Sequence, residues 1–370
     1  MAVVVARVVR ACCGVFPASG KSAVWPVVFA IFAAVFPMCG AAHVQDAGYG
    51  GKFGSRAVMD AIWTDAQLRG TEEESKVSSY HQPDLALPDG GCTPLRAQGE
   101  SNGVWGNIRS VSLRPDVGKV VALTFDFCEL STKTAGYDGG VIDFLRQRGI
   151  PATLFLGGKW MKTHPERAMQ LIADPLFEIG NHAWTHGNFA LLPVRDATEQ
   201  VMCTERQYEI LRSAVGARLH DGISHEEFEK IPNGLSLFRL PYGRVADANL
   251  DLLRKIGVRI VQWDVVVPEW ERISDKFVSE MGIRRGSILL MHATSVPPHT
   301  LENLKVIVGF LQKEGYSFAT VTELLDMGSP NVHTEGYFRH PGDNVFLDNR
   351  YLNYGTAHPP PNGHKPAGSG

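Results

Sequence analysis

Residues 120–128 read VVALTFDFC, and this stretch predicts a buried strand that places one carboxylate, Asp126, at the edge of a core. The apolar run from Val120 to Phe125 is nearly unbroken, as in a parallel strand that is covered on both faces. Because a buried, unpaired carboxylate is costly, Asp126 is either a structural residue with a partner nearby or a group kept for chemistry. Taken alone, the structural interpretation is favoured.

Downstream of this strand, apolar runs of strand length alternate with stretches of helical period. The predicted strands are residues 120–127, 151–157, 177–182, 236–241, 258–265, 287–292 and 317–322, and the predicted helices are residues 139–148, 164–173, 195–215, 247–256, 272–283 and 299–314. This alternation indicates βαβ units around a parallel sheet. It predicts an α/β fold, a distorted (β/α) barrel of about seven strands with its chemistry at the C-terminal strand ends.

Composition divides the chain into four parts. Residues 1–42 carry basic residues, then an uncharged apolar run and small residues, which is the order of a secretory signal peptide. We expect an irregular N-terminal extension over residues 43–115 with a short helix near 57–68, the main domain over 116–327, and a partly disordered tail over 328–370. The protein is expected to be exported, to the periplasm or outside the cell, or membrane-anchored if the first segment stays uncleaved.

Composition also limits the partners and leaves the cysteine pairing open. A net charge of -3 lacks the basic excess of a nucleic-acid-binding protein, and nothing implies a protein partner. Without residues 1–42, Cys92, Cys128 and Cys203 remain, so one disulfide leaves one cysteine over. The long connection at 217–235 is expected to be a solvated insertion, with a substrate-facing loop as the alternative.

Most of the predicted strand ends carry polar residues that catalysis can use. His182 and His186 follow the third strand four residues apart, a spacing that suits one metal ion, although paired histidines are often structural. Arg239 follows the fourth strand and can hold a buried carboxylate in its ionised form. His292 ends the sixth strand, where an isolated histidine is more often a core residue. Together these residues are a stronger signal than any one alone, because a barrel brings its strand ends to one face.

The fifth strand end adds two indoles and two acids within residues 263–270, WDVVVPEW. Core packing explains either Trp263 or Trp270 taken singly. A rim of aromatic and acidic side chains, including Asp264 and Glu269, also suits a sugar ring.

The order TFD, NHAWTH, RLPYG, WDVVVPEW and LLMH resembles that of the NodB-homology polysaccharide deacetylases, carbohydrate esterase family four. The resemblance covers about Val120 to Leu325 and includes the connecting stretches IPATLFLGGKW and LQKEGYSFATVTEL. It implies a (β/α) barrel that hydrolyses N-acetyl groups of an amino-sugar polymer such as peptidoglycan or a chitin-like chain.

The resemblance also implies a role for each matching residue. Asp126 matches the catalytic base, Arg239 the residue that orients it, and His292 the acid that protonates the leaving amine. His182 and His186 match ligands of a divalent metal, with zinc favoured, that polarises the acetyl carbonyl and the attacking water.

Four further residues are expected to bind substrate. The backbone N–H of Tyr242 matches a donor to the tetrahedral oxyanion, and Trp270 matches a wall of the pocket. Trp263 and Asp264 are placed at the same rim, and either Asp264 or Glu269 is expected to tune the catalytic partners.

Two positions depart from the family pattern. Phe127 stands where a second Asp usually completes the metal site, and Val266 stands where another Asp is common. Cys128 or Glu129 is an alternative ligand, and a Cys-His-His site would favour zinc. Against Cys128, a side chain one position further along a continuing strand points to the other face, and this cysteine can instead pair with Cys203.

The sequence therefore predicts an exported polysaccharide deacetylase, a hydrolase of linear amide bonds. Two alternatives stay open. One is a metal-independent amide hydrolase on the same scaffold, which would keep Asp126, Arg239 and His292. The other is a carbohydrate-binding protein that has kept the barrel and lost turnover.

Overall fold

The computed structural model describes residues 53–94, 106–220 and 223–350. The expected signal segment, residues 1–42, and residues 351–370 of the expected tail lie outside the described residues. Across the described ranges, no helix combines the length and the apolar character that crossing a membrane requires.

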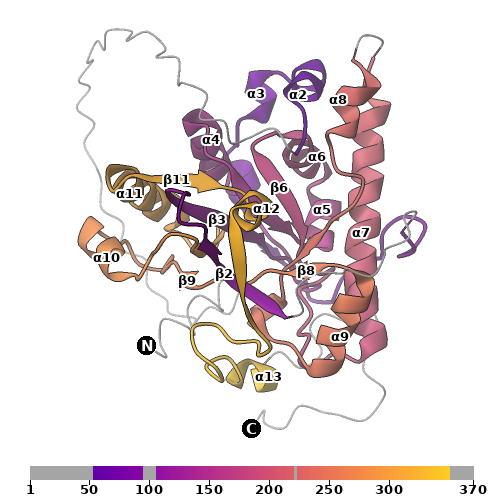
Figure 1. The fold of residues 1–370 in the computed structure, drawn as a ribbon. Helices are drawn as coiled ribbons and strands as arrows, with labels where there is room; N and C mark the ends of the chain where they lie inside the picture. The colour runs from indigo at the N-terminus through magenta and orange to yellow at the C-terminus, as the bar shows by residue number, and fades with distance from the viewer. Residues whose placement is uncertain (1–52, 95–105, 221–222, 351–370) are drawn as a thin grey trace, which may run out of the picture.

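A curled sheet of eight strands forms the centre of the molecule, with helices packed around it (Figure 1). The strands are β3 (Lys119–Phe127), β5 (Ala152–Leu156), β6 (Phe177–Asn181), β7 (Leu237–Phe238), β8 (Arg259–Ile260), β9 (Val265–Val266), β10 (Ile288–His292) and β11 (Tyr316–Ala319). Their order is β8-β7-β6-β5-β3-β10-β9, all pairs are parallel, and β11 also pairs with β3. The predicted distorted (β/α) barrel is confirmed, and every predicted strand is present, two of them shortened to two residues.

The helices follow the predicted alternation closely. They are α4 (Gly139–Arg148), α5 (Gly158–Thr163), α6 (Pro165–Ala173), α7 (Val194–Ala217), α9 (Asp247–Ile256), α10 (Asp275–Glu280), α11 (Thr300–Lys313) and α12 (Val321–Asp326). Local signals fix their ends, as α4 shows: Asp138 accepts a hydrogen bond from the N–H of Val141, and Gly149 ends the helix at φ 59°.

Side-chain alternation along β3 separates the two faces of the sheet. Phe125 and Phe127 join the core beneath the helices, and the Phe127 ring meets Trp160 of α5 with centroids 4.5 Å apart. Ala122 belongs to the alternate set of positions along the strand and joins the core inside the barrel. Because the period of a strand is two residues, Asp126 also faces the barrel interior.

Two flanking segments that looked irregular in sequence pair with each other. β2 (Asn107–Leu113) and β12 (Gly328–His333) form an antiparallel pair, so the described start of the expected tail, residues 328–350, is part of the fold. The pair sits against the barrel through Ile108, which bridges to Val261 beyond β8. Each strand finds its partner more than 200 residues away, as with Leu113 and Gly328, and local composition carries no signal of such a distant pairing.

The N-terminal extension contains more structure than one short helix. The expected helix near 57–68 is present as α2 (Arg56–Ile62) and α3 (Asp65–Leu68), and a capping box at Thr64 starts the second. The expected insertion at 217–235 contains α8 (His225–Glu229), and the backbone N–H of Gly54 donates to the carbonyl of Lys230 at 3.1 Å. Ile231 in the same stretch is fully buried, so the insertion is partly packed against the extension and is not a purely solvated loop.

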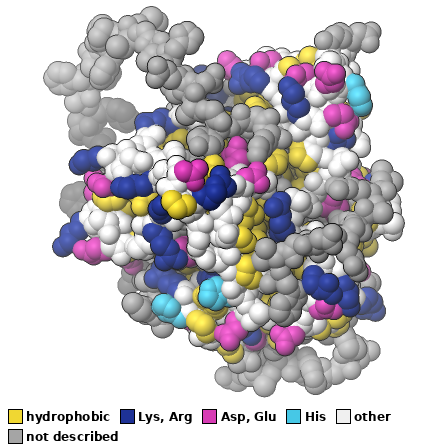
Figure 2. Space-filling view, in the orientation of Figure 1, with side chains coloured by type: hydrophobic (Ala, Val, Ile, Leu, Met, Phe, Trp, Pro, Cys, Tyr) yellow, Lys and Arg dark blue, Asp and Glu magenta, His cyan; other side chains and the backbone are white. Residues whose placement is uncertain are grey.

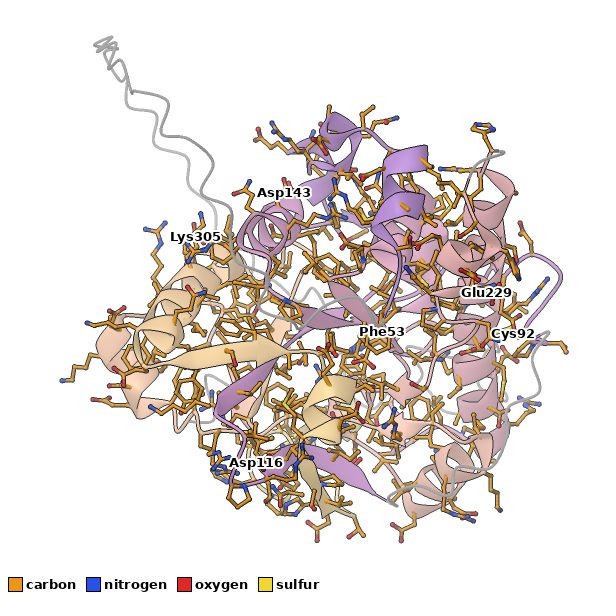
Figure 3. All side chains as sticks on the ribbon, turned by 45° about the horizontal axis from the view of Figure 1, so that its top comes forward. Phe53, Cys92, Asp116, Asp143, Glu229 and Lys305 are labelled. Atoms are coloured by element: carbon orange, nitrogen blue, oxygen red, sulfur yellow. A yellow bond between two sulfur atoms is a disulfide. The ribbon has the colours of Figure 1, made fainter. Side chains whose placement is uncertain are left out.

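One disulfide joins the N-terminal extension to the barrel. It links Cys92 to Cys203 of α7, and Figure 3 shows Cys92 beside that helix. This pairing excludes the alternative in which Cys128 pairs with Cys203.

We expect the double variant Cys92→Ser/Cys203→Ser to lose about 2–5 kcal/mol of unfolding free energy. The disulfide spans 111 residues, so its loss releases a large loop in the unfolded chain. Equilibrium denaturation in urea measures the effect, and reduction of the wild-type protein should reproduce it. A shift below about 0.5 kcal/mol would show that the extension is held by its other contacts alone.

Candidate active site

The loop that carries the two histidines leaves the C-terminal end of β6 and is held in place from two sides. The Asn181 side chain accepts a hydrogen bond from the N–H of Ala183 at 2.9 Å. Gln200 of α7 accepts two further backbone N–H groups of the loop through its Oε1, at 2.9 and 3.3 Å. Ala183 and His186 both adopt the left-handed region, at φ 64° and 60°. Such conformations cost energy and persist where the surroundings enforce them.

Both loop histidines are buried and are set up as neutral imidazoles. The Nδ1 of His182 lies 3.0 Å from the carbonyl oxygen of Arg239; a carbonyl only accepts, so Nδ1 carries the proton and Nε2 keeps its lone pair. The rings of His182 and His186 are 4.9 Å apart, and the Nδ1 of His186 is buried without a hydrogen-bond partner. Burial lowers the pKa of His182 and lowers the pKa of His186 well below its ordinary value.

The metal-free protein is expected to lose stability as the pH falls below about 6.5. Since the pKa of His186 is lowered by folding, the unfolded chain binds its proton first, and each such group removes about 1.4 kcal/mol per pH unit. Urea denaturation between pH 5 and 7 in chelator measures this slope. His186→Gln should flatten it, whereas His225→Gln, which removes an imidazole with a side chain 84% exposed, should not.

Asp126, the next-to-last residue of β3, lies beside a fully buried arginine. Its Oδ1 accepts a hydrogen bond from Nη1 of Arg239 at 2.9 Å, and its Oδ2 lies 3.5 Å from Nε2 of His182. The guanidinium also donates to Thr124 Oγ1 at 2.7 Å and to the carbonyls of Val261 and Gln262. Arg239 therefore fixes the carboxylate in position and balances its charge.

His292 ends β10 and pairs in register with Asp126 of β3. Its Nδ1 lies 2.7 Å from Oε2 of Glu269, and its backbone N–H donates to Oε1 of the same carboxylate at 2.8 Å. Thr300 donates to that oxygen as well, at 2.7 Å. Glu269, fully buried, thus holds the imidazole in one orientation.

The structure brings Tyr242 and Trp270 to different surroundings. Tyr242 occupies a 3₁₀ turn, η2 (Pro241–Gly243), at φ 60°, and its ring contacts that of His186 edge-on with centroids 4.4 Å apart. Trp270 is half-buried, packs against the core inside the barrel, and has an indole Nε1 that is buried without a hydrogen-bond partner.

Asp264 is not brought to the histidines, which differs from the expectation for the fifth strand end, whereas Trp263 packs beside Arg239, with its ring centroid 5.4 Å from the guanidinium carbon. The Trp263 indole is 2% exposed and donates to the carbonyl of Phe338 at 2.9 Å. Asp264 accepts the N–H of Ile288 at 2.8 Å, and Ile288 begins β10 whereas His292 ends it. Asp264 therefore lies at the opposite end of the parallel strands, in a cavity of about 550 Å³ that Arg109, Arg284 and Arg339 also line. The physical reason is that β9 is only two residues long. Asp264 comes before this strand and Glu269 comes after it, so the two acids lie at opposite ends of the sheet.

Two further contacts belong to the site, and the first of them could not be expected from the sequence. Asn344 of the C-terminal segment is fully buried and donates from Nδ2 to the carbonyl of Tyr242 at 2.9 Å. The Cys128 sulfur lies 3.4 Å from Nε2 of His182, and one ligand atom each of Cys128, His182 and His186 fall within 4.8 Å of one another. This donor set of nitrogen and sulfur fits a divalent metal such as zinc.

The face of the molecule seen in Figure 2 shows no single dominant charge. Acidic and basic side chains are interspersed there, with small hydrophobic patches between them. This distribution differs from the basic stripe of a nucleic-acid-binding face.

Comparison with known proteins gives one family and several relatives. Residues 114–221 match the model of the polysaccharide deacetylase family. The chain is 25% identical over 209 residues to the peptidoglycan-N-acetylglucosamine deacetylase PgdA of Listeria monocytogenes, covering 56% of this chain and 39% of that protein. It is 26% identical over 200 residues to a chitooligosaccharide deacetylase of Bradyrhizobium, covering 50% and 82%.

Among solved structures, one similar chain is the wild-type BA3943 of Bacillus anthracis, described as a CE4 family pseudoenzyme. Its TM-score is 0.47 at 24% identity, and the match covers 61% of this chain and 71% of that one. The chain spans about half the length, or less, of several curated relatives that it matches.

Proposed function

Because residues 114–221 match the polysaccharide deacetylase family, we propose that the protein is an exported hydrolase that removes N-acetyl groups from an amino-sugar polymer. One observation carries the proposal: a base, an acid and two neutral imidazoles meet at the C-terminal ends of parallel strands. In register, Asp126 of β3 stands beside His292 of β10, and Asp126 Oδ2 lies 3.5 Å from His182.

Asp126 acts as the base. It takes a proton from the water that attacks the acetyl carbonyl carbon, while Arg239 holds the carboxylate in place through its 2.9 Å hydrogen bond. A divalent metal bound by His182 and His186 would polarise the acetyl carbonyl and the water. The backbone N–H of Tyr242 would stabilise the oxyanion, a contribution worth about 3–4 kcal/mol where such donors have been removed.

His292 acts as the acid. It gives a proton to the amide nitrogen as the carbon–nitrogen bond breaks, so that the sugar leaves as an amine and acetate is released. Glu269 accepts a hydrogen bond from the Nδ1–H of His292. Nε2 is therefore the atom that exchanges the catalytic proton. Of the two acids expected to tune the partners, Glu269 is the one that contacts His292.

The disulfide and the relatives support the remaining parts of the proposal. A structural disulfide such as Cys92–Cys203 is typical of proteins in an oxidising compartment, which agrees with export to the periplasm or outside the cell. The substrate class, peptidoglycan or a chitin-like polymer, follows from the relatives named peptidoglycan and chitooligosaccharide deacetylases.

Acetate release from N-acetylglucosamine oligomers and from peptidoglycan tests the proposal. We expect release by the wild-type protein, its loss in strong chelator and its recovery on addition of zinc. Release that chelator leaves unchanged would favour the metal-independent hydrolase, which needs only Asp126, Arg239 and His292. Binding of the oligomers without any release would favour the carbohydrate-binding protein, which Phe127 in the place of a usual ligand makes a real alternative.

A further inference from the structure

Cys128 lies on the same side of its strand as the proposed base. β3 ends at Phe127, whose ring packs against Trp160 on the helix side of the sheet. Asp126 and Cys128 flank it and, two residues apart, face the barrel interior together. Cys128 is 2% exposed, so its sulfur meets the loop histidines away from solvent. As expected, Cys128 and Phe127 point to opposite faces. The objection to Cys128 as a ligand nevertheless fails, because His182 lies on the side of Cys128, 3.4 Å from its sulfur.

The distance between Cys128 and His182 is that of two ligands of one ion. Zinc binds cysteine sulfur at about 2.3 Å and histidine nitrogen at about 2.05 Å, so two such donors at a tetrahedral angle are about 3.5 Å apart. The observed separation of Cys128 Sγ and His182 Nε2 is 3.4 Å. His186 completes the group, since its ligand atom lies within 4.8 Å of both others.

The surroundings of both imidazoles suit metal binding. The carbonyl of Arg239 accepts a hydrogen bond from the Nδ1–H of His182 and leaves the lone pair of Nε2 free to bind a metal, the usual support of a metal-bound histidine. His186 is only 3% exposed, and its Nδ1 is buried without a hydrogen-bond partner. A buried polar atom without a protein partner is costly, and in folded proteins such an atom is usually satisfied by a bound water or ion.

Charge balance favours the sulfur over the nearby carboxylate. The charge of Asp126 is already matched by Arg239 at 2.9 Å. Two neutral imidazoles alone would leave a divalent ion without an anionic ligand in a buried site, and Phe127 offers none. The thiolate of Cys128 supplies the missing negative charge.

We infer that Cys128 forms a thiolate-containing metal site with His182 and His186, which takes zinc in place of harder ions. This inference rests on the proposed metal site of the deacetylase and names its third ligand. Sulfur ligation selects zinc over magnesium, calcium and manganese. Three protein ligands leave a fourth position for water, as in other catalytic zinc sites. Asp126 and His292 then remain available for proton transfer.

Cobalt substitution tests the inference without reference to activity. The protein, purified from an exporting host, is stripped with chelator and titrated with Co²⁺ while its absorbance is recorded. A thiolate ligand gives a near-ultraviolet sulfur-to-cobalt charge-transfer band. We expect this band in the wild type, and we expect added zinc to abolish it by displacing the cobalt.

Two variants of the same residue separate ligation from packing. Cys128→Ser should lose the band and should weaken zinc binding by more than about 100-fold, since even outer-shell changes cost 10–100-fold. Cys128→Asp should also lose the band and yet retain tighter metal binding than Cys128→Ser, because a carboxylate is a competent ligand. The thermal stability of the metal-free forms serves as the folding control. Cobalt bound by the wild type without the band, or an identical band in Cys128→Ser, would overturn the inference.

Failure of the inference and failure of the proposed function give different results. If the wild type shows the Cys128-dependent band and releases no acetate from any polymer, the site stands and the deacetylase proposal fails. If acetate release depends on metal but the band is missing, the deacetylase stands and Cys128 is not a ligand. Absence of both metal binding and acetate release would overturn both.

Discussion

Replacing Asp126 by Asn is expected to lower the rate of acetate release by about 10²–10⁴-fold, the range that a positioned base or acid contributes. The amide keeps the size of the side chain and an oxygen that can accept from Arg239, but it cannot take a proton from water. The loss should therefore appear in kcat, with the KM for N-acetylglucosamine oligomers changed little.

Asp116→Asn is the matched control, because that carboxylate has a side chain 77% exposed and lies just before β3. It should leave the rate of acetate release unchanged. A rate in Asp126→Asn within about threefold of wild type would show that another group removes the proton, and the assignment of the base would fail.

The residues at the strand ends could be predicted because each follows an apolar run directly. Asp126 is the next-to-last residue of β3, His182 follows β6, and His292 ends β10, so the hydrophobic pattern alone predicts their place in the barrel. A parallel sheet then brings these ends to one edge, whatever the loops between them do.

Residues beyond a strand end are less predictable, since their place depends on where the strand stops. Asp264 and Glu269 are five residues apart, yet one accepts the N–H of Ile288 and the other contacts His292, at opposite ends of β10. The sequence argued against Cys128 as a ligand for a similar reason. That argument took Phe127 as the position that faces the metal, whereas Asp126 and Cys128 face the histidines and Phe127 faces the helices.

Contacts from distant segments left no signal in the sequence. The C-terminal segment looked like a tail because Gly, Pro and Asn dominate it, but such residues also form turns that pack tightly. Within it, Asp348 forms an ion pair with Arg244 at 2.5 Å, and Asn344 holds the carbonyl of Tyr242. Partners separated by about a hundred residues cannot be matched from one sequence, because many polar residues are equally suitable.

The second large effect is expected for Arg239→Met, which should lower the unfolding free energy by about 3–5 kcal/mol at neutral pH. The side chain is fully buried, and its removal leaves the Asp126 carboxylate in the interior without its cation. Two backbone carbonyls and Thr124 Oγ1 lose their donor as well. Equilibrium denaturation measures the loss, and Arg218→Met, which breaks an ion pair with side chains 40% and 49% exposed, should cost less than about 1 kcal/mol.

The double variant Asp126→Asn/Arg239→Met separates the charge from the packing. If the unpaired carboxylate is the main cost, Asp126→Asn should restore part of the stability that Arg239→Met loses. The double variant should then lose less unfolding free energy than the sum of the two single losses. A double variant whose losses simply add would instead assign the role of Arg239 to its carbonyl and ring contacts. Its position beside Phe155, 4.0 Å from the guanidinium carbon to the ring centroid, would then matter more than its pairing with the base.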